Sequence, residues 1–236
     1  MKSFNMENYK CIFFDLDHTL WDYESNSRDT LLELYEQFRL EEKGVLSSND
    51  FLIQFKRVNM ELWDLYDSGK IESEVIRKER FKQVLEAFDA YEPSLSEDIS
   101  HVYLHTCPTK NKLMPAALET VEYLAGKYSL TIVTNGFEDI QHTKLKSMNL
   151  NRYFDHVITS QRAGAKKPSR EIFDFALSTN AITAQQAIMV GDNLKTDIAG
   201  ARNASIDTVF YNPESGHHAE VVKHEISALE QLSQFL

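Results

Sequence analysis

Cysteine, glycine and proline are all scarce in this chain. Its 236 residues include only 2 Cys, 8 Gly and 5 Pro. So few cysteines exclude a small disulfide-stapled scaffold, and the low Gly and Pro content excludes collagen-like or low-complexity sequence. Because 42% of the residues are hydrophobic, the chain can bury a sizeable core. We therefore expect a globular protein made of one large domain, or of one domain carrying an insertion.

Positive charge and long apolar runs are also lacking. The chain has 25 Lys and Arg residues against 36 Asp and Glu, a formal net charge of −11. This charge opposes binding to a nucleic-acid polymer or an anionic membrane, although a small anion can still bind where a few cations or a metal gather. The N-terminal residues are too polar for a secretory signal, and no apolar run approaches the ~20 residues of a membrane span. We expect a soluble, cytoplasmic protein that contacts neither nucleic acid nor membrane.

Short apolar runs predict five buried parallel strands, at residues 9–14, 130–134, 157–159, 187–190 and 208–211. Between the last four strands lie helical patterns, at residues 139–150, 169–177 and 194–203. The alternation of strand and helix favours an α/β fold with a parallel sheet.

The stretch from residue 23 to about residue 110 breaks this alternation, because its apolar residues fall at helical spacing. After a helix start at Ser48-Asn49-Asp50, this spacing is clearest in the row Phe51, Leu52, Phe55, Val58, Leu62 and Trp63. We expect a helical bundle at residues 22–109, inserted after the first strand. The remaining residues, 1–21 and 110–236, then form an α/β core of ordinary domain size.

Two acidic residues follow the first predicted strand, in the sequence Asp15-Leu16-Asp17-His18-Thr19-Leu20. On an extended chain, a spacing of two residues points Asp15 and Asp17 to the same side. Their carboxylates repel each other unless a cation joins them, and Mg²⁺ accepts both carboxylate and phosphate oxygens as ligands. The structural alternative is a strand end at which acidic residues merely begin a turn.

The second strand ends in Thr134-Asn135-Gly136, which offers a hydroxyl, an amide and backbone N–H groups to an anionic oxygen. The same three residues also form an ordinary turn sequence. After the third strand, Lys166-Lys167-Pro168 could supply a cation for phosphate, with Pro168 as the first residue of a helix. The alternative is a solvated basic loop, and spacing does not decide which lysine faces inward.

The fourth strand ends in Gly191-Asp192-Asn193, and Asp197 follows about one helical turn later. Asp192 stands where a third carboxylate would complete a metal site, and Asp197 could orient a ligand or the lysine. Either aspartate could instead cap a helix. However, all four clusters fall at the carboxyl ends of predicted parallel strands, the edge where open α/β sheets bind ligands. We therefore treat the clusters as one candidate site.

With these residues in view, the chain resembles the haloacid dehalogenase-like hydrolases. The pattern of that family is Asp-x-Asp-x-Thr, then Thr or Ser, then Lys-Pro, then Gly-Asp with a later Asp, and both order and spacing agree over about residues 9–211. The resemblance implies a Rossmann-like parallel sheet core with an inserted all-helical (type 1) cap. Phe-Phe-Asp-Leu-Asp-His-Thr-Leu, Ile-Val-Thr-Asn-Gly-Phe and Lys-Lys-Pro-Ser-Arg-Glu-Ile-Phe look like the pyrimidine 5′-nucleotidase branch.

The resemblance implies a phosphatase that uses Mg²⁺ and an aspartyl-phosphate intermediate. Asp15 would be the nucleophile, and Asp17 would be the general acid and then the general base. The Asp15 carboxylate, the Asp17 main-chain carbonyl and Asp192 would hold Mg²⁺. The expected substrate is a small phosphorylated metabolite, and the branch favours a pyrimidine nucleoside monophosphate.

The remaining positions that match the family pattern would bind the phosphate group or support residues that bind it. Thr134 and the Asn135 backbone would hold phosphate oxygens, and Lys167 would neutralise charge in the transition state. Asp197 would not touch the substrate and would support the residues that do. His18 stands where many family members have glycine, and nothing in the mechanism requires its ring.

Other functions remain open at this point. A phosphatase for sugar phosphates or other small metabolites, or a phosphomutase, would share the core residues, and a non-catalytic binding protein could share the fold. Dehalogenases of the same superfamily lack a carboxylate at the place of Asp17, which argues against dehalogenation. Trp21, Tyr23, Trp63 and Tyr66 could stack on a nucleobase, but aromatic residues at helical spacing more often form a bundle core.

Overall fold

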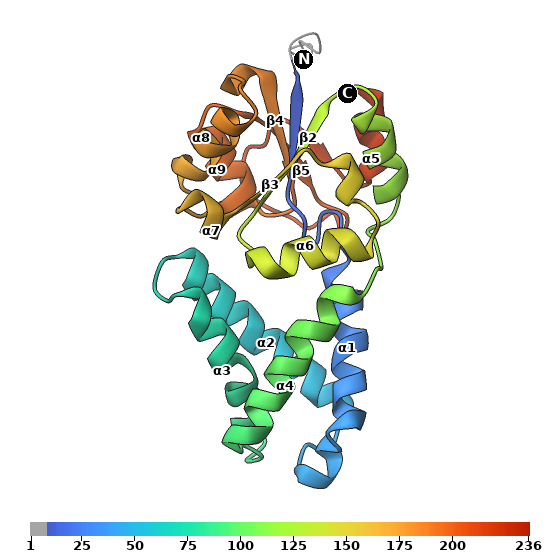
Figure 1. Ribbon diagram of the computed structural model, residues 1–236, viewed down its shortest axis with the longest axis vertical. Helices are drawn as coiled ribbons and strands as arrows, with labels where there is room; N and C mark the ends of the chain where they lie inside the picture. The colour runs from blue at the N-terminus through green and yellow to red at the C-terminus, as the bar shows by residue number, and fades with distance from the viewer. Residues whose placement is uncertain (1–8) are drawn as a thin grey trace. The chain divides into compact units, whose positions relative to one another are not determined.

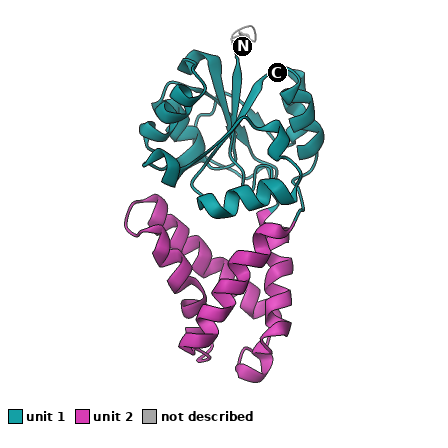
Figure 2. Cartoon of the chain, in the orientation of Figure 1, with its two compact units in different colours: residues 1–22, 111–236 teal, residues 23–110 magenta. Residues whose placement is uncertain are grey.

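The computed structural model describes residues 9–236. They divide into two compact units (Figure 2). The first unit contains the described residues up to Asp22 together with Asn111–Leu236, and the second unit is Tyr23–Lys110. Among residues 9–236, no helix is both long enough and apolar enough to cross a membrane.

The first unit is built on a parallel sheet of six strands in the order β3-β2-β1-β4-β5-β6 (Figure 1). The strands are β1 Cys11–Phe14, β2 Ser129–Thr134, β3 His156–Thr159, β4 Ala187–Gly191, β5 Asp207–Tyr211 and β6 Glu225–Ile226. All four residues of β1 and all five of β4 are buried, as expected for strands that are covered on both faces. The prediction of an α/β fold with a parallel sheet is confirmed.

Helices cover the two faces of this sheet, with α8 and α9 on one side and α5 on the other (Figure 1). The helices of the first unit are α5 Ala117–Ala125, α6 Glu138–Ser147, α7 Ser160–Ala163, α8 Arg170–Thr179 and α9 Ala199–Asn203. Shorter turns are η4 Asn151–Tyr153, η5 Ala184–Gln186, η6 Leu194–Ile198 and η7 Leu229–Gln234. Phe13, Val133 and Met189 of the sheet share a buried apolar cluster with Phe173 of α8 and Ala201 of α9.

One local prediction for this unit is wrong. Pro168 is not the first residue of a helix: Ser169 caps α8 through its side chain, and the helix begins at Arg170. The helical pattern expected over residues 194–203 is confirmed, and it contains two kinds of helix. It starts as the π-helical turn η6, capped by the Asn193 side chain at the N–H groups of Lys195 and Thr196, and continues as α9.

The second unit is a bundle of helices: α1 Tyr23–Gln37, η2 Leu40–Lys43, α2 Ser48–Asp67, α3 Ser73–Glu86, α4 Pro93–Thr106 and η3 Cys107–Thr109. Ser47 caps α2 by accepting a hydrogen bond from the Asp50 N–H. The rings of Phe55, Phe81 and Tyr103 form a core cluster with centroids 5.3–5.4 Å apart. Tyr66 is buried in the bundle, and its ring meets that of Trp63 edge to face.

Candidate active site

Asp15 lies at the point in the sheet where the strand order reverses. Its strand, β1, is flanked by β2 and β4, and the sheet continues from these neighbours in opposite directions. The Asp15 N–H donates to the carbonyl of Val190 across 2.9 Å, which extends the pairing of β1 with β4 by one residue. In open α/β sheets, ligands bind in the crevice outside the strand ends at this reversal. Asp15 therefore stands where this fold offers a binding site.

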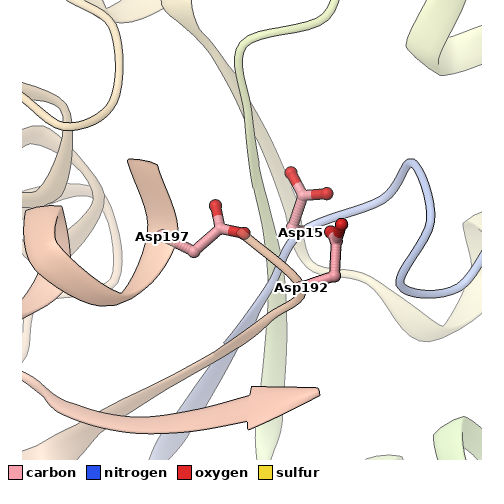
Figure 3. A group of neighbouring side chains, drawn as sticks. All are labelled: Asp15, Asp192 and Asp197. Carbon is pink, nitrogen blue, oxygen red and sulfur yellow. The ribbon is translucent and has the colours of Figure 1, made fainter. Parts of the chain in front are cut away.

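Three aspartates gather at this place. Asp192 directly follows β4, Asp197 belongs to η6, and each supplies a carboxylate oxygen within 4.8 Å of one from Asp15 and of one from the other (Figure 3). Asp192 is fixed by Thr19, whose hydroxyl donates to Asp192 Oδ1 across 3.1 Å. The Asp17 carboxylate is not in this group. It is engaged by residues of α6.

Burial and mutual repulsion make the three aspartates difficult to ionise. Burial raises the pKa of Asp15 to about 7, against the opposing charge of Lys167 and with a contribution from Asp197. Burial and the charge of Asp15 raise the pKa of Asp192 to about 6. A divalent cation would offset both effects, and carboxylate oxygens are the donors that Mg²⁺ prefers. Three carboxylates and one ammonium group leave a formal charge of about −2, which fits such an ion.

Lys167 is the lysine that faces inward. Its Nζ lies 2.5 Å from Asp15 Oδ1, 2.6 Å from Asp197 Oδ1 and 2.8 Å from the carbonyl oxygen of Val133. Only 3% of the side chain is exposed, and burial opposes its charge, yet the two carboxylates raise the pKa of Lys167 above its ordinary value. The ammonium group is therefore a fixed positive charge directly beside Asp15.

The side chain of Asn135 holds the backbone of Lys167. Asn135 Oδ1 accepts from the Lys167 N–H across 2.8 Å, and Asn135 Nδ2 donates to the Lys167 carbonyl across 2.9 Å. Sequence reasoning counted this amide among the donors to an anion, whereas the structure engages it in placing the lysine. Any contact of Asn135 with phosphate would thus be made by its backbone.

Asp197 holds the side chain of Lys167. Its Oδ1 accepts from Lys167, and its Oδ2 accepts from the Asn193 N–H across 3.0 Å. Gly191 makes this possible, because a Cβ atom there would lie 2.3 Å from Asp197 Oδ2. Neither Asp192 nor Asp197 caps the following turn. Asn193 does so, so the helix-cap alternative for the two aspartates is wrong.

Two residues that the sequence analysis missed hold the Asp17 carboxylate. Lys144 Nζ lies 2.5 Å from Asp17 Oδ1, and Gln141 Nε2 donates to Asp17 Oδ2 across 2.8 Å. Burial opposes the ionisation of Asp17, but these contacts hold its pKa below the ordinary value. The available signal was their spacing: both residues lie on one face of the helix that directly follows Thr134-Asn135-Gly136.

Thr134 is set up as a hydrogen-bond donor. Its Oγ1 accepts from the Gly136 N–H across 3.0 Å and from Gln141 Nε2 across 2.8 Å. A hydroxyl has two acceptor positions and one hydrogen, so these contacts fill both acceptor positions. The hydroxyl hydrogen is then directed to another acceptor, such as an anionic oxygen.

The backbone at His18 has a positive φ of 61°. This left-handed conformation favours glycine, so a glycine would fit the backbone at this position without strain. The turn brings the His18 N–H within 3.0 Å of the Trp21 carbonyl oxygen.

Comparison with known proteins identifies a family and several relatives. The family model described as haloacid dehalogenase-like hydrolase matches residues 12–211. The HAD-hydrolase YfnB of Bacillus subtilis is 27% identical over 234 residues, which cover 98% of this chain and 97% of YfnB. A crystal structure of YfnB, described as bound to magnesium, has a TM-score of 0.87 at 26% identity, covering 96% of this chain and 98% of that one.

Two further relatives have named activities. The pyrimidine 5′-nucleotidase YjjG of Escherichia coli is 30% identical over 231 residues, which cover 95% of this chain and 96% of YjjG. The glyceraldehyde 3-phosphate phosphatase of Pyrococcus furiosus is 31% identical over 221 residues, covering 92% of this chain and 85% of that protein. Since the family match spans every strand-end cluster from Asp15 to Asp197, the chain belongs to the haloacid dehalogenase-like hydrolase family.

Proposed function

We propose that the protein is a Mg²⁺-dependent phosphomonoesterase that forms an aspartyl-phosphate on Asp15. The observation that carries this proposal is the setting of the Asp15 carboxylate. It lies at the carboxyl ends of the strands, with the Lys167 ammonium group 2.5 Å away and two further carboxylates close by. A nucleophile that must approach an anionic phosphate needs positive charge beside it, which Lys167 supplies and which a Mg²⁺ ion held by the carboxylates would increase. The phosphatases and nucleotidase among the relatives support the same chemistry.

The metal would be held by the Asp15 carboxylate, the Asp17 main-chain carbonyl and Asp192. Asp197 is less suited, because its two oxygens already accept from Lys167 and Asn193. When bound, Mg²⁺ would shield the negative charges of nucleophile and phosphate from each other. We further propose that the helical unit Tyr23–Lys110 serves as the cap of this phosphatase core.

The reaction proceeds in two steps. First, a carboxylate oxygen of Asp15 attacks phosphorus, the bond from phosphorus to the ester oxygen breaks, and Asp17 gives its proton to the leaving alkoxide. Lys167, the Thr134 hydroxyl and the Asn135 backbone N–H neutralise and orient the phosphoryl oxygens. Then water attacks phosphorus, Asp17 takes its proton, and Asp15 and inorganic phosphate are released. The ion pair of Asp17 with Lys144 favours the ionised form that this second step needs. The protonated form that the first step needs would be favoured by the negative charge of the bound phosphate, because a like charge nearby raises the pKa of a carboxyl group.

The substrate we propose is a pyrimidine nucleoside 5′-monophosphate. The similarity to YjjG over nearly the whole chain supports it, as do the sequence runs around Asp15, Thr134 and Lys167. A small sugar phosphate is the second candidate, because the glyceraldehyde 3-phosphate phosphatase is similar to a comparable degree.

The test is a phosphate-release assay of wild type and Asp15→Asn, with Mg²⁺ and with a chelator, on nucleoside monophosphates, sugar phosphates and other alkyl phosphomonoesters. We expect turnover chiefly of pyrimidine monophosphates, lost with Asp15→Asn and with the chelator. Asp98→Asn, at an exposed aspartate of α4, is the matched control and should keep full activity. Preference for sugar phosphates would overturn the nucleotidase assignment alone. Activity that survives both Asp15→Asn and the chelator would overturn the mechanism.

A further inference from the structure

A polar pair on α6 is buried at the same strand-end edge as the proposed active site. Gln141 and Lys144 lie three residues apart and therefore share one face of the helix. Gln141 is 0% exposed and Lys144 is 6% exposed. Burying such side chains costs free energy unless they are hydrogen-bonded or paired with charge. Their partners are Asp17 and Thr134.

The two side chains fix the orientation of the Asp17 carboxylate. Lys144 contacts Oδ1 at 2.5 Å and Gln141 contacts Oδ2 at 2.8 Å, so each oxygen has its own donor. Rotation of the carboxylate about its last bond would disturb both contacts at once. Lys144 is itself held over the Trp21 ring, with Nζ 4.3 Å from the centroid, in a cation–π contact.

Gln141 also connects Asp17 with Thr134. Its Nε2 carries two hydrogens, and it donates to Asp17 Oδ2 and to Thr134 Oγ1 across 2.8 Å each. Gly136 leaves room for this amide, because a Cβ atom there would lie 1.9 Å from Gln141 Nε2. Among the described residues, the buried Gln141 Oε1 has no hydrogen-bond partner. A residue kept only for packing would not need to carry that cost.

We propose that Gln141 and Lys144 are positioning residues, which aim the Asp17 carboxyl group at the leaving oxygen and turn the Thr134 hydroxyl toward the phosphate. This inference rests on the proposed role of Asp17 as general acid. Neither α6 residue touches the substrate. In the first step the proton moves from the Asp17 carboxyl group to the ester oxygen as the bond from phosphorus to that oxygen breaks.

A positioning role can be distinguished from a general loss of active-site structure by the way in which the rate depends on the leaving group. An alkyl phosphate departs as a strongly basic alkoxide, so the rate of its transfer depends on a well-placed acid. An aryl phosphate such as p-nitrophenyl phosphate departs as a weakly basic phenolate and needs little proton transfer. The value of kcat/KM reports the first step for both substrates, because it covers events only up to the first irreversible one.

The experiment measures kcat/KM for the best alkyl phosphomonoester of the assay above and for p-nitrophenyl phosphate. The variants are Gln141→Met, Lys144→Met and Lys144→Arg, with Lys146→Met at an exposed position of α6 as the matched control. We expect Gln141→Met and Lys144→Met to lower the alkyl value by about 100-fold and the aryl value by less than about 10-fold. Lys144→Arg should recover part of the alkyl loss, and Lys146→Met should change neither value.

Equal losses on both substrates, or no loss on either, would overturn the inference. Should Lys144→Met not fold, as judged by thermal unfolding, Lys144→Gln carries the same expectation. Asp17→Asn distinguishes the two levels of proposal. If Asp17→Asn discriminates between the substrates and the α6 variants do not, the positioning inference alone is wrong. If Asp17→Asn does not discriminate, the general-acid role is wrong, and the inference falls with it.

Discussion

The ammonium group of Lys167 presents three hydrogens around one compact charge, and three oxygens accept them. Two belong to carboxylates and the third is the Val133 carbonyl oxygen. A planar guanidinium group at the same place would need acceptors arranged in a flat fork. The environment therefore favours lysine by geometry as well as by charge. The two hydrogen bonds from the Asn135 side chain fix the backbone of Lys167, so that its side chain reaches these three oxygens.

A second carboxylate contact, which is half-exposed, lies away from the active site and gives a pH-dependent prediction. The Tyr9 hydroxyl donates to Asp207 Oδ2 across 2.6 Å, and Lys223 Nζ lies 2.9 Å from Oδ1. Burial opposes the ionisation of Asp207, but these contacts hold its pKa below the ordinary value. A carboxyl group whose pKa is lowered by folding stabilises the native state above its unfolded pKa of about 3.9, and this contribution is lost as pH falls through the folded value.

We therefore expect Tyr9→Phe to lower the free energy of unfolding by about 1 kcal/mol at pH 7, a modest figure because Asp207 is half-exposed. The deficit should shrink as pH falls below about 4, because Asp207 becomes protonated first in the unfolded chain and then, at lower pH, in the native protein. Urea unfolding at pH 7, 5, 4 and 3 measures it, with Tyr91→Phe at an exposed tyrosine as the control. A deficit of the same size at pH 7 and pH 3 would contradict the prediction.

At the scale of secondary-structure elements, the junctions after β2 and β4 each depend on a glycine beneath a functional side chain. Gly136 lies under Gln141, and Gly191 lies under Asp197. Both side chains are buried and hydrogen-bonded, so neither can move aside at low cost. The turn after each strand therefore requires glycine, because a side chain of the following helical segment occupies the space that a Cβ atom would need.

For the β4 junction we expect Gly191→Ala to destabilise the protein by about 1–3 kcal/mol, the usual cost of overpacking a buried site. It should also lower kcat, because displacement of Asp197 displaces Lys167. Gly126→Ala is the matched control, since a Cβ atom at Gly126 would meet only the Tyr123 carbonyl, at 3.4 Å. Urea unfolding and the phosphate-release assay measure the two effects. Equal stability and activity of the two variants would show that Asp197 can give way.

The same elements show what a sequence pattern can and cannot predict here. The strand β1 reads as an uninterrupted apolar run because both of its faces are covered, so it was predictable. The strand β6 is only two residues long, with one of them exposed, and leaves no such pattern. The helical pattern at residues 194–203 was predictable, but its opening π-helical turn was not, because that turn is capped by the Asn193 side chain and periodicity does not encode it.

The candidate site also contains residues that the sequence predicts and residues that it does not. The side chains of Asp15, Asp192 and Asp197 follow strand ends, and their meeting follows from parallel strands alone. Gln141 and Lys144 look like polar residues on a solvent-facing side of a helix. Their spacing places them on one face of α6, but it does not reveal that this face covers Asp17, because that contact is tertiary.

At the scale of the whole molecule, the proposed metal site couples ion binding to stability. A ligand that binds only the native state stabilises it by about 2.7 kcal/mol when present at 100 times its dissociation constant. We expect saturating Mg²⁺ to raise the midpoint of thermal unfolding by several degrees. Asp192→Asn should abolish this shift, whereas Asp98→Asn should keep it. A shift that survives Asp192→Asn would exclude Asp192 as a ligand.

The sheet order has a consequence for the sequence of events during folding. The central strand β1 is made first, yet its two neighbours, β2 and β4, come more than a hundred residues later in the chain. The unit Tyr23–Lys110 forms its own set of contacts, so it can become compact before the strands that pair with β1 have been synthesised. A nascent chain that stops short of Ala187 therefore exposes one edge of an apolar strand, and an exposed apolar edge is a template for aggregation. We therefore expect aggregation through β1 chiefly in ribosome-bound chains that end before Ala187.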